Sequence, residues 1–187
     1  MKNRTHEATG AAVTLAVCSA LGTGALVAAG AVCASLLGSR LPDADQLGTR
    51  IHRRTRLERR RFSASLVGGL LRLPITIFAA LAKHRGATHW LLSGAVVTFA
   101  LTVAAGALWA SLTLPVAIGT ACGYWAHLLA DACTPRGAPL LGPFSFRRVH
   151  LLPARHRVVT GGRGDLLLLI TATLTAAVLG LAVLQSP

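Results

Sequence analysis

Charged side chains are scarce in this chain of 187 residues: they make up 13% of the sequence, and only six residues are acidic. A soluble domain of ordinary composition carries about 25% charged residues. The sequence is instead 53% hydrophobic, with a mean hydropathy of +0.59. The shortage of charge excludes an ordinary soluble domain and indicates an integral membrane protein.

Paired cysteine motifs are also missing. The four cysteines, Cys18, Cys33, Cys122 and Cys133, lie in apolar stretches and form no CxxC pair. Isolated thiols of this kind behave as small hydrophobic side chains, which argues against disulfides and thiolate metal ligands. Internal repeats and low-complexity tails are absent as well. We therefore expect residues 1–187 to form a single integral membrane domain.

Long apolar stretches are abundant, and four of them carry almost no charge: residues 11–37, 90–114, 115–132 and 165–184. Each approaches or exceeds the roughly 20 residues that a helix needs to cross a bilayer. The first is far longer than the roughly 7–15 residues of a signal-peptide core. In spite of the basic start at Lys2 and Arg4, a retained membrane segment is expected.

Arginines outside these stretches dominate the net charge of +13. Eight lie between residues 40 and 61, and six lie between residues 136 and 163. Because basic loops of membrane proteins stay in the cytosol, we expect both loops, 40–61 and 134–163, on that side. We expect this positive charge to bind membrane lipids and no specific nucleic acid. We therefore expect a multi-pass protein of the cell membrane.

This topology predicts an all-α fold, a polytopic membrane helical bundle of about four transmembrane helices plus an interfacial helix. The interfacial helix is residues 63–82, because Arg72 and Pro74 near its middle would be costly in lipid. A tight turn is expected at Leu114–Pro115, between two spans. Gly119 and Gly123 form a small-xxx-small motif that favours close helix packing.

The first apolar stretch is compatible with two topologies. A single crossing would place the amino terminus outside, since the arginine-rich loop after the stretch outweighs Lys2 and Arg4. Alternatively, a break at Gly22-Thr23-Gly24 divides it into two short helices that return as a re-entrant hairpin. The hairpin is the preferred solution because it would bring His6 to the same side as Asp43.

Three polar clusters lie at the edges of the apolar stretches, and on this topology all three reach the cytosolic side. Their acids and histidines are Asp43, Asp45, His84, His89, His127 and Asp131. Ionisable groups beside hydrocarbon are costly, so they are retained mainly where they pair or bind something. Carboxylates and imidazoles are ligands for zinc, manganese and iron. The clusters therefore predict a metal site at the rim of the membrane.

His127 and Asp131 are four residues apart, so they share one face of a helix and can reach the same ion. The alternative is a His–Asp hydrogen bond at a helix end. Asp43 and Asp45 form a DxD loop that offers two carboxylates, although nearby basic side chains would also pair with them. By contrast, the histidines among the arginines are expected to be solvated: His52, His150 and His156.

His84 and His89 flank Gly86, which allows both imidazoles to point inward from the start of the following helix. Arg85 between them is a fixed cation suited to a phosphate or carboxylate group, and Thr88 is placed to orient such a substrate. The alternative is a polar interfacial belt beside a tryptophan.

These motifs resemble those of the YdjM-type family of bacterial inner-membrane proteins, which are described as membrane-bound metal-dependent hydrolases. The shared elements, in order, are His6, LPDAD (41–45), HRGATH (84–89), GYWAHLLAD (123–131), TPRGAPLL (134–141) and FSFRR (144–148). One departure is Gln46, where the family often has a histidine. If that histidine is a ligand in relatives, this chain has one ligand fewer or uses water.

Residues and resemblance together predict a membrane-bound metal-dependent hydrolase that acts on a phosphoester or lipid-linked substrate. The expected cofactor is a divalent metal ion, zinc or manganese, and the ligand pool is His6, Asp43, Asp45, His84, His89, His127 and Asp131. Asp45 or Asp131 would accept a proton from water that the metal activates, and Arg85 would hold an anionic or phosphorylated substrate. The alternatives are a metal transporter or sensor, and a non-catalytic structural membrane protein.

Overall fold

The computed structural model describes residues 1–43 and 86–185, and these residues form a helical bundle without a named strand. The five α-helices are α1 (Asn3–Ala20), α2 (Ala25–Gly38), α6 (Leu91–Leu108), α7 (Thr113–Ala132) and α8 (Arg163–Gln185). Short 3₁₀ helices lie at Ala87–His89 (η1), Ala110–Leu112 (η2) and Ala154–His156 (η3). The predicted all-α class is confirmed. The predicted interfacial helix, residues 63–82, lies outside the described residues.

The first apolar stretch is a helical hairpin, so the single crossing is wrong. α1 ends at Ala20, and α2 begins at Ala25 and packs back against α1. Gly22 makes the reversal possible because it adopts a φ of 62°, a left-handed conformation that side chains with a Cβ disfavour. With only 14 residues, α2 is shorter than the roughly 20 residues of a spanning helix.

Three helical segments of the described chain are long and apolar enough to cross a membrane: Leu91–Leu108, Ala110–Ala132 and Arg163–Gln185. Large hydrophobic side chains such as Phe99 on α6 and Leu174 on α8 are exposed on the bundle, as expected for helices that face lipid. Among the described residues, these three segments and the hairpin of the first stretch form the predicted membrane helical bundle.

The turn between the first two spans lies at Trp109–Leu112 and ends before the predicted Leu114–Pro115 step. Pro115 is instead the third residue of α7. In the first turn of a helix the backbone N–H groups have no acceptor within the helix, so proline costs nothing there. The proline therefore opens the returning helix and does not make the turn.

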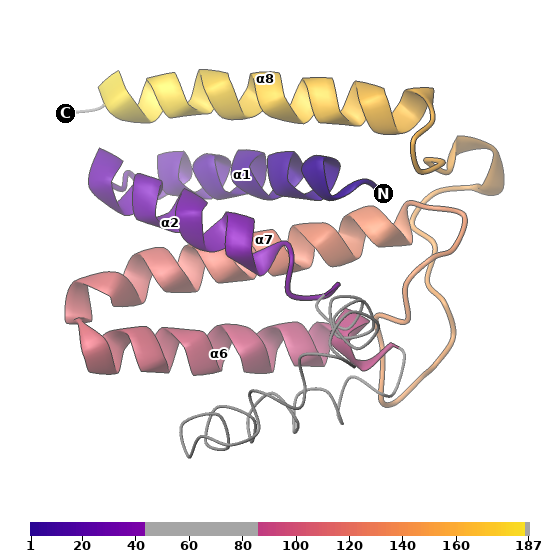
Figure 1. The fold of residues 1–187 in the computed structure, drawn as a ribbon, viewed down its shortest axis with the longest axis horizontal. Coiled ribbons are helices and arrows are strands. Elements are labelled where there is room, and N and C mark those ends of the chain that lie inside the picture. The colour runs from indigo at the N-terminus through magenta and orange to yellow at the C-terminus, as the bar shows by residue number, and fades with distance from the viewer. Residues whose placement is uncertain (44–85, 186–187) are drawn as a thin grey trace, which may run out of the picture.

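α7 is the central helix and contacts α1, α2 and α6, while α8 packs on α1 (Figure 1). The predicted close packing at Gly119 and Gly123 is confirmed. A Cβ on either glycine would collide with a backbone carbonyl of α2, that of Ala31 or Ser35. α7 and α2 can touch along this line only because these positions lack side chains.

The direction of the helices gathers the polar clusters at one end of the bundle. α1, α6 and α8 begin at this end, and α2 and α7 finish there (Figure 1). The arginine-containing connection between α7 and α8 also lies at this end, which the positive-inside rule places in the cytosol.

Candidate metal centre

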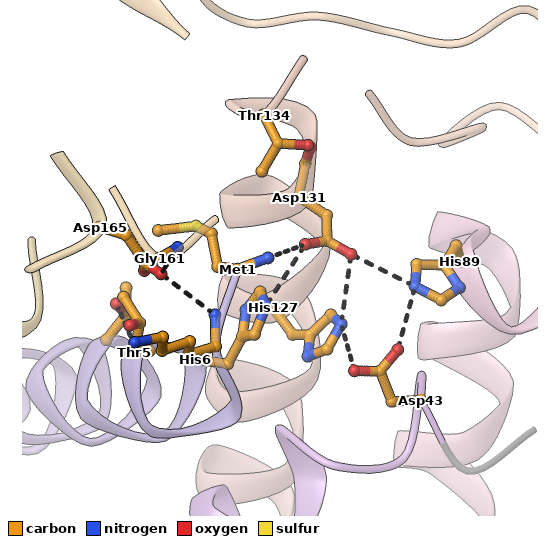
Figure 2. A network of polar contacts seen from close by, with 12 residues as sticks. Met1, Thr5, His6, Asp43, His89, His127, Asp131, Thr134, Gly161 and Asp165 are labelled. Atoms are coloured by element: carbon orange, nitrogen blue, oxygen red, sulfur yellow. Dashed lines mark hydrogen bonds and ion pairs between the residues drawn. The ribbon is translucent and has the colours of Figure 1, made fainter. Parts of the chain in front are cut away.

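Five predicted ligands from separate parts of the chain meet at the cytosolic end of the bundle (Figure 2). They are His6 of α1, Asp43 just after α2, His89 of η1, and His127 and Asp131 of α7. The four-residue spacing on α7 places its two side chains together, as predicted: His127 Nε2 lies 3.5 Å from Asp131 Oδ2.

Four of these side chains form a closed ring of nitrogen–oxygen contacts. His89 Nε2 is 3.4 Å from Asp131 Oδ2, and the same nitrogen is 3.9 Å from Asp43 Oδ1. The other oxygen of Asp43, Oδ2, lies 3.9 Å from His127 Nε2. Two imidazoles and two carboxylates thus alternate around the ring, each nitrogen between two oxygens. Two overlapping triads have ligand atoms close enough to share one ion: Asp43, His89 and His127, and His6, His127 and Asp131.

These separations fit a metal ion better than direct hydrogen bonds. A tetrahedral ion with ligands at about 2.0–2.1 Å separates neighbouring ligand atoms by about 3.4 Å. The nitrogen–oxygen distances of 3.4–3.9 Å in the group lie near or somewhat above that value. Hydrogen bonds between the same atom types are about 2.7–3.2 Å long. Imidazoles and carboxylates together are a donor set that could hold a metal ion.

His127 is held with its Nε2 atom facing the group. Its Nδ1 lies 2.7 Å from the backbone carbonyl oxygen of Ser39, at the end of α2. A carbonyl only accepts, so Nδ1 carries a proton, and in the neutral ring Nε2 is the acceptor nitrogen. His127 is 1% exposed, and its Nε2 has no hydrogen-bond partner. A buried acceptor of this kind needs a partner, and a cation would supply one.

His89 is held by the residue before it. Its Nδ1 lies 3.2 Å from the hydroxyl oxygen of Thr88. The carbonyl oxygen of Thr88 in turn accepts a hydrogen bond from the Tyr124 hydroxyl, which ties η1 to α7. Gly86, with a φ of 128°, permits the bend that starts η1. His89 therefore lies at a loop-to-helix junction, as predicted, whereas His84, the other imidazole of that prediction, lies outside the described residues.

His6 lies on the other side of Asp131. Its Nε2 is 3.3 Å from Asp131 Oδ1, and its ring stacks on that of His127 with centroids 3.8 Å apart. The amino group of Met1 also lies 3.4 Å from Asp131 Oδ1. α1 is not among the spanning helices, and burial lowers the pKa of His6 more than the Asp131 carboxylate raises it. The ring is therefore neutral at pH 7, as a metal ligand must be.

Burial differs across the group. His6 and His127 are buried, whereas His89, Asp43 and Asp131 are partly exposed.

Asp165, at the start of α8, was not identified from the sequence. Its Oδ2 accepts hydrogen bonds from the backbone N–H of Gly161 at 2.8 Å and of Lys2 at 3.4 Å. The carboxylate is 2% exposed. Its hydrogen bonds attach the first turn of α1, which carries His6, to the start of α8. The only available signal was that one of six acidic residues begins an apolar helix.

Three predicted site residues, and two histidines that were expected to be solvated, remain to be placed. Asp45, His84 and Arg85 lie outside the described residues, so their roles stay predictions. His150 and His156 lie on the connection between α7 and α8 and contact the Pro135 carbonyl and the Arg155 side chain, away from the group. The four cysteines are free thiols, and none belongs to the candidate ligand groups found among the described residues.

The three spans, the hairpin and the polar rim define a multi-pass helical protein of the cytoplasmic membrane. The chain belongs to the YdjM inner membrane protein family, whose family model matches residues 1–186. No match is found among curated proteins or among solved structures.

Proposed function

We propose that this protein is a membrane-bound hydrolase that uses a divalent cation, zinc or manganese, to cleave a phosphoester or lipid-linked substrate at the cytosolic rim. The observation that carries the proposal is the convergence of His89, His127, Asp43 and Asp131 at nitrogen–oxygen distances of 3.4–3.9 Å. The buried, unpartnered Nε2 of His127 supports a cation at this point.

In this proposal the four alternating side chains hold the ion, and His6 holds Asp131. His6 Nε2 lies 3.3 Å from the second oxygen of Asp131, Oδ1, its ring stacks on His127, and the three side chains form a group that could hold an ion. It is therefore placed to orient two ligands, or to bind a second ion that shares Asp131. Asp45 and His84 remain predicted additions to the ligand pool.

The bound ion would supply a Lewis acid that makes water a nucleophile near neutral pH. Side chains of the protein would accept the proton and bind the substrate. A carboxylate oxygen of Asp131 or of Asp45 would accept the proton from water. Arg85 would hold the anionic group of the substrate. The Thr88 hydroxyl already contacts His89, so its first role is to orient that ring, and its contact with substrate stays a prediction.

Metal content is the first test. Detergent-purified protein, loaded with zinc or manganese and desalted, should retain about one ion per chain or, with a second site, about two. Asp131→Asn and His127→Ala should lose it, whereas His150→Ala, which removes a histidine from the neighbouring connection, should not. Equal metal content in all four proteins would refute the proposed site.

Hydrolysis is the second test. Phosphate release from a short-chain phosphatidate in mixed micelles should require the metal-loaded protein and should vanish in Asp131→Asn. A metal-loaded protein that cleaves neither this lipid nor other lipid phosphoesters, but moves zinc into sealed vesicles, would support the transporter instead. The candidate ligands lie at or near the ends of their helices, and this favours the hydrolase because a transport path needs polar groups along the spans.

A further inference from the structure

A second surface at the cytosolic end combines exposed aromatic rings with arginines. We call it the FSFRR loop, residues 138–149. Its base is closed by two backbone hydrogen bonds between Ala138 and Val149, of 3.2 and 2.8 Å. Within it, Ser145 N–H donates to the Leu141 carbonyl at 3.0 Å. The loop is therefore a defined structure and not an open connection.

The loop is fastened to the start of a spanning helix. The N–H of Leu91, the first residue of α6, donates to the Leu140 carbonyl at 2.9 Å. Trp90, the residue before α6, packs edge-on against Phe146 with ring centroids 6.1 Å apart. Because the first turn of a spanning helix marks the boundary of the membrane, the loop lies at the level of the lipid headgroups.

The outer face of the loop suits that level. Phe144 is 91% exposed and Phe146 is 73% exposed, a costly arrangement in water. Arg147 and Arg148 follow directly and are exposed, and no acidic residue occurs between Asp131 and Asp165. Apolar rings with adjacent cations complement an interface in which acyl chains lie next to phosphates.

We propose that the FSFRR loop is a lipid-binding element that inserts Phe144 and Phe146 into the inner leaflet and binds the phosphate of anionic phospholipids through Arg147 and Arg148. The guanidinium groups match phosphate oxygens in charge and geometry. The proposal does not depend on hydrolysis or on the metal group, because none of the proposed ligands lies in the loop.

Lipid retention tests the arginines. Delipidated full-length protein is mixed with phosphatidylglycerol or phosphatidylcholine, and bound lipid is counted by native mass spectrometry. Phosphatidylglycerol should be retained preferentially, and Arg147→Gln/Arg148→Gln should weaken its binding about tenfold or more. The control Arg155→Gln/Arg157→Gln removes the same charge from the same connection. In each pair one arginine donates to a backbone carbonyl, Arg148 to Arg136 and Arg157 to Leu152. Equal losses in both pairs would overturn the proposal.

The depth of the loop in the membrane tests whether the aromatic rings insert into the inner leaflet. A nitroxide label is placed at Phe144→Cys, or for comparison at Val159→Cys, in full-length protein whose four native cysteines are alanine and whose thermal stability is unchanged. In nanodiscs containing phosphatidylglycerol, the label at 144 should be relaxed by oxygen dissolved in lipid, and the label at 159 by a water-soluble nickel complex. A label at 144 that meets the nickel complex, or neither agent because protein covers it, would overturn the proposal.

Discussion

Replacing Thr88 by valine tests whether the residues around the metal group act through the ligands. The change keeps the shape of the side chain and removes the hydroxyl that lies 3.2 Å from His89 Nδ1. Loss of such an outer hydrogen bond typically weakens metal binding about 10- to 100-fold, or by about 1.4–2.7 kcal/mol. The fold should suffer less, because one partly buried hydrogen bond contributes about 0.5–1.5 kcal/mol.

The assay is competition for zinc against a chromogenic chelator, beside thermal unfolding of the metal-free protein in detergent. Thr88→Ser is the matched control, since it keeps the hydroxyl and should bind zinc nearly as wild type does. The reasoning is refuted if valine leaves zinc affinity unchanged, or if serine lowers it as much as valine does. A large fall in the unfolding temperature of the metal-free valine variant would also contradict it, because the hydroxyl would then support the fold.

Three further outcomes are expected. Asp165→Asn should weaken zinc binding several-fold without removing a ligand, because the first turn of α1 is then held less firmly; unchanged affinity would count against this fastening. Gly123→Val should abolish monodisperse protein in size-exclusion chromatography, since its Cβ would meet the Ser35 carbonyl, whereas Gly164→Ala, with only ordinary contacts, should behave as wild type. Retained zinc should fall as the pH is lowered below about 6, because protonated imidazoles cannot bind it; zinc retained at pH 4 would speak against histidine ligands.

Most of the described site could be predicted from the sequence because its residues carry strong local signals. A histidine and an aspartate four residues apart on an apolar helix must share a face. Ionisable groups at the edges of membrane spans are costly, so they usually pair or bind a ligand. The glycines Gly22 and Gly24 likewise predicted the break between α1 and α2, and the resulting hairpin places His6 on the same side as Asp43.

The rest depends on backbone geometry that side-chain identity does not encode. The Ser39 carbonyl fixes the tautomer of His127, but any residue at position 39 offers a carbonyl. Asp165 accepts its hydrogen bonds from backbone N–H groups, and such partners likewise give no recognisable pattern in the sequence. The turn before α7 was misplaced because proline suits a turn and the first turn of a helix equally well.

The most direct test of the central claim is X-ray absorption spectroscopy of the zinc-loaded, full-length protein. If Asp43, His89, His127 and Asp131 hold one ion, the first shell consists of about four nitrogen and oxygen atoms at about 2.0–2.1 Å, with the multiple scattering of two imidazoles. The His127→Ala variant should lose that signal. Sulfur at about 2.3 Å, or a spectrum without imidazole scattering, would contradict the account.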